Sequence, residues 1–204
     1  MRHEARNVLR ALASARMSQP LVVLVGGPPA GGKSTVAEAI GRLTGLVTLH
    51  KDAFKEPLMD EFGVESVMDS MALSSAALVS FFAAADAVAA RDAGVILEST
   101  FTVRDMDRIE RLRANRGAIL LQVHVTAATD VLMRRWNERS GRRHPGHLDA
   151  QRAAEVRARI ERKTWDPLRL DAPLMPIDTS EGQTFYAASW LDEIRRAMDA
   201  AATR

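Results

Sequence analysis

The chain has no cysteine among its 204 residues, and aromatic residues make up only 5% of it. The absence of cysteine excludes a disulfide framework, a thiolate metal centre and a cysteine nucleophile. Acidic and basic residues nearly cancel, with 26 of the former and 28 of the latter, so no broad basic surface for nucleic acid is expected. The scarcity of aromatic side chains also leaves little that could stack on single-stranded bases.

Long hydrophobic runs are also missing from the sequence. The apolar stretch at residues 83–90 contains Asp86 and is far shorter than the roughly 20 residues that a membrane span requires. Residues 1–19 interleave arginines with apolar residues and lack a secretory-type apolar core, which predicts an amphipathic N-terminal helix. We therefore expect a cytoplasmic protein with no membrane segment.

Short β-branched and leucine-rich runs alternate with segments of helical composition. The runs lie at residues 21–25, 46–50, 95–98, 118–125 and 173–178. This alternation predicts a single α/β domain over residues 1–204 with a parallel sheet, because strands buried on both faces read as continuous apolar runs. We also expect one long helix or a helix pair at residues 64–92, a helix–loop–helix at 130–164 and a last helix at 184–201.

The first predicted strand is followed at once by Gly-Pro-Pro-Ala-Gly-Gly-Lys-Ser at residues 27–34, which matches the phosphate-binding pattern G-x-x-x-x-G-K-[ST]. Glycines let backbone N–H groups turn toward a phosphate, and the helix that follows directs its positive end at the same anion. We expect Lys33 to bridge the β- and γ-phosphates, Ser34 to bind Mg²⁺ and Thr35 to reach the α-phosphate. The predicted nucleotide-binding residues of the loop are Gly27, Pro28, Ala30, Gly31, Gly32, Lys33, Ser34 and Thr35.

Carboxylates stand at the ends of the second and third predicted strands, where a parallel sheet borders its ligand crevice. Asp52 is the candidate general base for a hydroxyl that attacks the γ-phosphate, although an aspartate here is also suited to capping the next helix. We expect Glu98 to hold Mg²⁺ through water or to hydrogen-bond the acceptor, the alternative being a solvated carboxylate. Arg104 either clamps an anionic part of the acceptor or lies on a solvated helix.

Arginines are concentrated just before and within a Gly- and Pro-containing loop. Five of them fall within ten residues: Arg134, Arg135, Arg139, Arg142 and Arg143. Guanidinium groups that close over a transferred phosphoryl group stabilise its charge and exclude water, so we expect a helical lid, the alternative being a solvated basic face. Arg135 and Arg139 are expected to be catalytic because their spacing places them on one helical face. His144 and His147 lack a third ligand at convincing spacing, and zinc is not expected.

Three of the four lysines, Lys33, Lys51 and Lys55, lie within 23 residues of a chain that otherwise uses 24 arginines as its cations. This concentration suggests that lysine is specifically required there. At the end of the fifth predicted strand, Thr179 stands among short polar residues that could hold adenine.

The loop at 27–34, the segment Lys51-Asp52-Ala53-Phe54-Lys55, the strand end Leu97-Glu98-Ser99-Thr100 and the arginine-rich segment together resemble small P-loop kinases. That family includes zeta toxins, chloramphenicol phosphotransferase and bacterial polynucleotide-kinase-like enzymes. The resemblance covers residues 21–180 and implies a three-layer P-loop fold with a five-stranded parallel sheet of order 2-3-1-4-5. It also implies ATP–Mg²⁺ as donor, Asp52 as base and Lys33 as phosphate lysine. Lys55, in the same segment as Asp52, is a candidate substrate-binding residue. Ser99 stands where zeta-like kinases usually carry glycine.

These observations predict an ATP-dependent phosphotransferase that acts on a hydroxyl of a small molecule. An antibiotic is one candidate acceptor, because residues 64–92 are suited to a partly apolar pocket and the Ala- and Arg-rich composition resembles that of bacteria with resistance kinases. A zeta-toxin-like kinase of UDP-sugars, a polynucleotide 5′-hydroxyl kinase and a non-enzymatic ATP-dependent switch are the alternatives. The sequence identifies neither an antitoxin-binding surface nor an oligomeric state.

Overall fold

The computed structural model describes residues 19–91 and 93–181. The helix expected at residues 184–201 and all but the last residue of the one expected at 1–19 lie outside this part of the chain. The strands are β1 (Leu21–Gly26), β2 (Val47–His50), β3 (Val95–Glu98), β4 (Ile119–Thr126) and β5 (Leu174–Asp178). The helices are α2 (Lys33–Thr44), α3 (Lys51–Phe62), α4 (Val67–Ala89), α5 (Met106–Arg116), α6 (Thr129–Arg139) and α7 (Asp149–Glu161), with 3-10 turns η1 (Val103–Asp105) and η2 (Pro145–His147).

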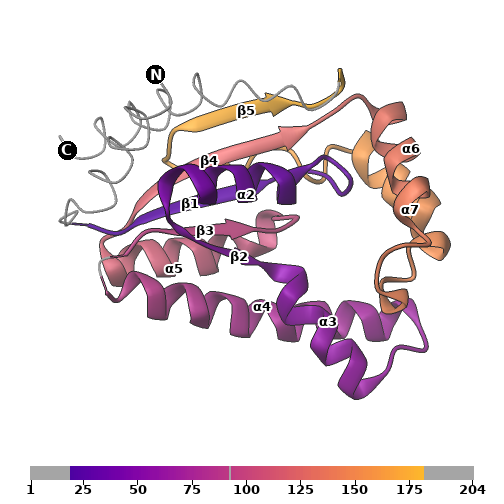
Figure 1. The fold of residues 1–204 in the computed structure, drawn as a ribbon, viewed down its shortest axis with the longest axis horizontal. Helices are drawn as coiled ribbons and strands as arrows, with labels where there is room; N and C mark the ends of the chain where they lie inside the picture. Colours follow the sequence, from indigo (N-terminus) through magenta and orange to yellow (C-terminus); the bar gives the residue numbers. More distant parts are fainter. Residues whose placement is uncertain (1–18, 92, 182–204) are drawn as a thin grey trace.

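The strands form one parallel sheet in the order β2-β3-β1-β4-β5, which confirms the predicted fold and strand order (Figure 1). Glu98 at the end of β3 is in register with both Val25 of β1 and His50 of β2. The carboxyl ends of these three strands therefore finish at one level. The loop at residues 27–34 and the start of α3 leave the sheet from this edge, which faces α6 and α7 in Figure 1.

The two faces of β1 contribute to separate hydrophobic cores. Val22 and Leu24 pack with Phe81 of α4 and Ile109 of α5 on one face. The alternate β1 side chains pack with α2 on the other face, against Val36, Ala37 and Ile40. Burial on both faces explains why β1 reads as a continuous apolar run, and the resulting layers are helix, sheet and helix.

Helix α4 is a single long helix where the sequence allowed one helix or two. Its start is fixed by a capping box, in which the Ser66 side chain accepts from the Asp69 N–H and the Asp69 side chain accepts from the Ser66 N–H. By length and composition alone α4 could cross a membrane, with a mean hydropathy of 1.7, so the sequence analysis underestimated this apolar segment. Phe81 and Ala85 of the helix are nevertheless fully buried in the core beneath the sheet.

The lid consists of α6, the loop at residues 140–148 with its turn η2, and α7, as the sequence predicted for residues 130–164. Trp136 of α6 packs against Val156 of α7 and Trp165. The indole N–H of Trp136 donates to the backbone oxygen of Asp149 at 3.0 Å, which ties the two lid helices together. Figure 1 shows that the lid faces α3 and α4 across the end of the sheet.

Candidate active site

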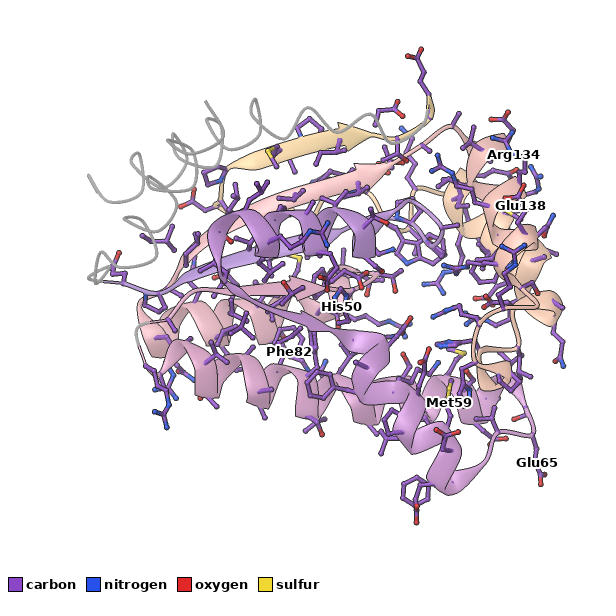
Figure 2. The ribbon with its side chains drawn as sticks, in the orientation of Figure 1. His50, Met59, Glu65, Phe82, Arg134 and Glu138 are labelled. Carbon is purple, nitrogen blue, oxygen red and sulfur yellow. The ribbon has the colours of Figure 1, made fainter. Side chains whose placement is uncertain are left out.

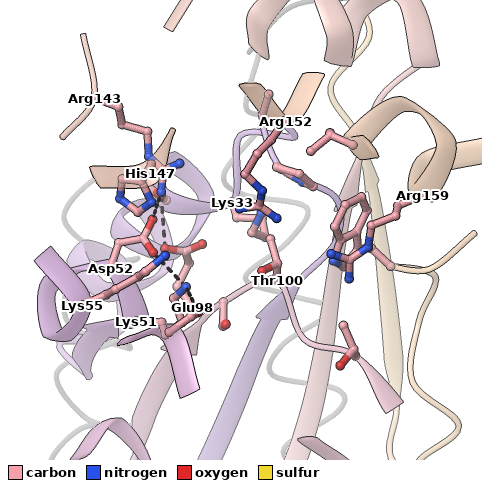
Figure 3. Close-up of a pocket in the computed structure, with 18 of the residues that line it drawn as sticks. Lys33, Lys51, Asp52, Lys55, Glu98, Thr100, Arg143, His147, Arg152 and Arg159 are labelled. Carbon is pink, nitrogen blue, oxygen red and sulfur yellow. Dashed lines mark hydrogen bonds and ion pairs between the residues drawn. The ribbon is translucent and has the colours of Figure 1, made fainter. Parts of the chain in front are cut away.

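A cavity of about 560 Å³ lies at the carboxyl edge of the sheet, between the phosphate-binding loop, α3, α4 and the lid (Figure 3). Cationic side chains dominate its wall: Lys33, Lys51, Lys55, Arg104, Arg108, Arg135, Arg139, Arg143, Arg152 and Arg159. The acidic side chains in the wall are Asp52, Glu98 and Asp105. This balance of charge suits a polyanionic ligand such as a nucleoside triphosphate.

The phosphate-binding loop adopts backbone conformations that its glycines permit. Gly27 has φ +126°, and a Cβ atom there would overlap the backbone oxygen of Val125 in β4. Gly32, with φ +89°, turns the chain into α2, whose first residue is Lys33. The Lys33 ammonium donates to the Pro28 oxygen at 2.8 Å, and burial lowers its pKa to about 8 although Glu98 acts in the opposite direction. The loop thus leads through positive-φ glycines into the N-terminus of α2 beside a buried lysine, an arrangement suited to an oligophosphate.

Ser34 and Glu98 lie together at the base of this loop. The Ser34 hydroxyl donates to Glu98 Oε2 at 3.2 Å, and the same oxygen lies 3.0 Å from His50 Nδ1. The other ring nitrogen of His50 lies 2.7 Å from Glu38 Oε1. The hydrogen bond with Glu98 raises the pKa of His50 to about 9 against the opposing effect of burial, so His50 is a cation between two carboxylates at neutral pH. Hydroxyl and carboxylate oxygens are the protein ligands that Mg²⁺ prefers, so Ser34 and Glu98 fit this ion.

Asp52 lies in the first turn of α3 and forms ion pairs on two sides. Lys51 Nζ is 3.0 Å from its Oδ1, and Arg143 of the lid contacts its Oδ2. Burial alone would raise the pKa of Asp52, but the charges of Lys51 and Arg143 outweigh it and hold this pKa well below its usual range. Asp52 is therefore ionised throughout the physiological range. It has no N-cap side-chain bond, since α3 is preceded by His50 as its cap residue.

Arg139 and Arg143 are held in the lid by Asp149, whose side chain is almost fully buried. Arg143 lies 3.2 Å from Asp149 Oδ1, so its guanidinium bridges Asp149 and Asp52. Arg139 stacks over the Trp136 ring at 4.6 Å, and its buried Nε has no hydrogen-bond partner among the described residues. Burial and the neighbouring charge of Arg143 lower the pKa of Arg139 to about 10. Both guanidinium groups line the cavity and can oppose negative charge there.

Arg135 of the lid hydrogen-bonds to Thr179 at the end of β5. Arg135 lines the cavity, but its guanidinium donates to the Thr179 hydroxyl at 2.8 Å and to the Thr179 backbone oxygen at 2.7 Å. The Thr179 hydroxyl in turn lies 3.1 Å from the backbone oxygen of Gly31 and 3.0 Å from that of Thr126, and it can donate to either. This network connects β5 and the lid to the phosphate-binding loop, and Thr179 is buried behind that loop. Arg143, which the helical spacing did not favour, is the arginine that contacts Asp52.

The remaining predicted acceptor residues lie in the cavity wall. Arg104 is exposed on η1, and Lys55 is buried between α3 and α4, where it donates to the Ser70 hydroxyl at 3.0 Å. Near the lid, Arg159 stacks on the ring of Trp165 at 4.4 Å, and both line the cavity. These flat groups can stack on a nucleobase. Sequence patterns gave no indication of them, because the two residues come together only through the packing of α7.

Acidic residues on one face of α3 meet the loop that joins the lid helices. His147 lies 2.9 Å from Glu56, and His144 lies 2.9 Å from Asp60 (Figure 2 shows this end of α3 beside Met59). Asp52, Glu56 and His147 are close enough together to share a metal ion. The positive charges of Arg143, Lys51 and Lys55 lie near His147 and oppose a bound cation. Burial and the charge of Arg143 also lower the pKa of His147 to about 3, so its imidazole is neutral. These residues form the contact through which the lid rests on α3.

The chain is similar to a known domain family and to several known proteins. A model of the AAA domain family matches residues 22–163. Uncharacterized proteins of Mycobacterium bovis and Mycobacterium tuberculosis are 28% identical over 191 residues, which is 89% of this chain and 37% of each of theirs. The chain thus spans little more than a third of the length of these curated relatives.

Solved structures of kinases share the fold. A candidate kinase from Chloroflexus aurantiacus matches with a TM-score of 0.78 and 29% identity, covering 88% of this chain and 99% of that one. A sugar kinase from Janibacter sp. matches with a TM-score of 0.55 and 21% identity over 90% and 97% of the two chains, a likeness that concerns the fold alone. The molecule therefore has a P-loop kinase-like fold.

Proposed function

The chain belongs to the AAA domain family, and from its site we propose that it is an ATP-dependent kinase that phosphorylates a hydroxyl of a small molecule. One observation carries the proposal. The phosphate lysine, Lys33, and an ionised carboxylate, Asp52, line the same cavity, and the lid arginines Arg139 and Arg143 line it as well. A donor site, an acceptor site and a charge-stabilising lid therefore meet in one cavity.

The donor side is built around the phosphate-binding loop. Backbone N–H groups of the loop hold the β-phosphate, while Lys33 contacts the β- and γ-phosphates. Ser34 and Glu98 are the residues that would hold Mg²⁺, which supplies positive charge to the phosphates when bound. His50 positions Glu98, because its Nδ1 lies 3.0 Å from Glu98 Oε2. The nucleobase is expected on the side of Arg159 and Trp165, where flat side chains line the cavity.

The acceptor side is built around Asp52. The acceptor hydroxyl donates a hydrogen bond to this carboxylate and attacks the γ-phosphorus in line with the leaving oxygen. The new O–P bond forms as the bond to the β,γ-bridging oxygen breaks, and ADP leaves with that electron pair. The hydroxyl proton passes to Asp52 late in the reaction, which a weakly basic carboxylate can support because the transition state is loose. Arg139 and Arg143 oppose the charge that spreads over the transferred group.

The cavity wall favours the candidate acceptors to different degrees. The acceptor part of the wall has few apolar side chains, Met71 and Leu78 among them, which does not favour the partly apolar pocket expected for an antibiotic. The anionic phosphates of a UDP-sugar would suit the cationic wall. A polynucleotide acceptor is less favoured, because the aromatic residues Trp136 and Trp165 lie on the lid side of the cavity and do not line a groove for a nucleic-acid strand. An ATP-dependent switch would leave the acceptor-side carboxylate without a role.

The test is replacement of Asp52 by Asn, read in two separate assays. ATP–Mg²⁺ binding, measured by calorimetry, should remain within about threefold of wild type, because Asp52 lies outside the phosphate-binding loop. Acceptor-stimulated ADP release should fall by at least about 100-fold. Asp60→Asn is the matched control, since Asp60 lies two turns further along α3 and contacts only the lid loop among the described residues. An Asp52→Asn protein that transfers phosphate at the wild-type rate would overturn the assignment.

A further inference from the structure

Helices α3 and α4 face each other through two lysine–serine pairs. Lys51 Nζ donates to the Ser74 hydroxyl at 3.2 Å, and Lys55 Nζ donates to the Ser70 hydroxyl at 3.0 Å. The lysines are four residues apart on α3 and the serines four residues apart on α4, so each helix contributes neighbouring side chains of one face. All four side chains line the cavity, and we refer to them as the lysine–serine ladder.

Lys55 is the unusual member of this ladder. Only 3% of its surface is exposed, and Ser70, its hydrogen-bond partner, is neutral and fully buried. Among the residues that the structure describes, no carboxylate forms an ion pair with Lys55. An ammonium group offers three donors, so two of them lack a protein acceptor here. Burial of a charge without an ionic partner is costly, and such a group is more common at functional sites than in a structural core.

Further hydroxyl and cationic side chains line the cavity besides the lysine–serine ladder. The hydroxyls of Ser75 and Thr100 also line the cavity, together with the guanidinium groups of Arg104 and Arg108, whereas the Thr102 hydroxyl donates to Asp105. Hydroxyl and cationic donors in this arrangement bind oxygen anions rather than apolar surfaces. Figure 3 shows Lys51 and Lys55 beside Asp52, so the ladder adjoins the carboxylate that we assign to the acceptor hydroxyl.

We propose that the acceptor is an anionic hydroxyl compound whose carboxylate or phosphate group binds the lysine–serine ladder while its hydroxyl lies at Asp52. This inference rests on the proposed kinase function, because it assigns Asp52 to the acceptor. Asp52 and Lys55 are three residues apart on α3, a spacing that places side chains about 5–6 Å from one another. The hydroxyl and the anionic group are therefore only a few bonds apart, as in a small sugar acid or sugar phosphate.

The protonation of Lys55 agrees with an anion-binding role. Burial and then the charge of Lys51 lower the pKa of Lys55 to about 7, and the other charges that act on it are Asp52, Arg152 and Arg143. A bound anion favours the charged ammonium, so it raises this pKa again. Anion binding should accordingly weaken as the pH rises above about 7.

The first experiment measures binding without catalysis. The protein has four lysines, so [ε-¹³C]lysine labelling gives four side-chain NMR signals, which Lys→Arg variants assign. Inorganic phosphate is added after the phosphate-binding loop has been saturated with a non-hydrolysable ATP analogue and Mg²⁺. The Lys55 signal should then titrate at least one pH unit higher than without phosphate, while the signal of exposed Lys163 stays unchanged. If phosphate leaves the Lys51 and Lys55 signals unaltered, or shifts all four equally, the ladder is not an anion site.

The second experiment compares matched acceptors in an ADP-release assay. Each pair has one neutral member and one anionic member: a hexose with its sugar acid, a hexose with its phosphate, and a nucleoside with its monophosphate. We expect the anionic member of a pair to stimulate release, and Lys55→Met to raise its KM at least tenfold with a smaller change in kcat. Ser70→Ala should also raise the KM for the anionic acceptor. Agreement between the two variants shows that the effect does not come from misfolding of Lys55→Met.

The outcomes separate the two proposals. Preference for the neutral member, or an unchanged KM in Lys55→Met, overturns the anionic acceptor and leaves the kinase function standing. If ATP–Mg²⁺ binds and no acceptor of either kind stimulates ADP release, the kinase function fails, and the NMR titration still decides whether the ladder binds an anion.

Discussion

Arg143 of the lid forms an ion pair with Asp52 of α3 and contacts the buried Asp149 with its other terminal nitrogen. Because Asp52 lies on α3 and Asp149 is the first residue of α7, one guanidinium group connects the acceptor carboxylate to the lid. The planar fork of arginine can donate in both directions at once, which an ammonium group cannot do with the same geometry. Arg143 thus both attaches the lid to α3 and balances the negative charge of Asp52.

Replacement of Arg143 by Ala is expected to lower kcat by about 100-fold, because the lid loses one of its contacts with α3 and the transferred phosphoryl group loses a cation. Arg143→Lys keeps the charge but cannot bridge both carboxylates, so kcat should still fall by about tenfold. Steady-state ADP release measures both effects. Arg142→Ala is the matched control, since Arg142 is the adjacent and exposed arginine. If kcat fell equally in the Arg142 and Arg143 variants, the overall positive charge of the lid, and not the Arg143 bridge between Asp52 and Asp149, would be responsible for the effect.

The fold could be predicted because its signals are local. A buried parallel strand reads as an apolar run, and the phosphate-binding loop has a fixed pattern between a strand and a helix. The order of the strands came from resemblance to a family and agrees with the structure. Asp52 and Glu98 could be chosen as candidate site residues from their places at strand ends, because parallel strands bring those ends to one edge of the sheet.

The remaining parts of the site depend on packing that sequence spacing does not encode. Helical spacing favoured Arg135 with Arg139, but α6 ends at Arg139, and the loop beyond it carries Arg143 to Asp52. The lysine–serine ladder arises only when α3 and α4 pack together. His50 gave no signal at all, because its charge results from the two carboxylates that it meets in the folded state.

His50 is expected to make the free energy of unfolding depend on pH. Its pKa is about 9 in the folded protein, whereas an unperturbed histidine has a pKa of 6.5. The protonated form of His50 therefore stabilises the fold fully below pH 6.5, and this contribution is lost as the pH rises toward 9. At pH 6, His50→Gln should lower the free energy of unfolding by on the order of 2–3 kcal/mol, and at about pH 9.5 the difference should be close to zero. Urea unfolding across this range measures it.

A double-mutant cycle with Glu98 identifies the partner responsible. Glu98→Gln removes the strongest contributor to the raised pKa of His50, so this variant should also lose most of the pH dependence. The double variant should be little less stable than either single one, because the two residues share the interaction. Additive losses would contradict the pairing of His50 with Glu98.

The Gly27→Ala variant tests whether nucleotide binding depends on the backbone shape of the phosphate-binding loop. The φ of +126° at Gly27 is unfavourable for any L-residue with a side chain, and an added Cβ would overlap the Val125 backbone oxygen. Gly27→Ala should therefore lower the free energy of unfolding by about 2 kcal/mol or more and weaken ATP–Mg²⁺ binding at least tenfold. Calorimetry and urea unfolding measure these quantities. Gly141→Ala is the control, since a Cβ there meets nothing within 4 Å, and it should change stability by less than about 0.5 kcal/mol. Normal ATP affinity in Gly27→Ala would mean that this turn does not shape the nucleotide site.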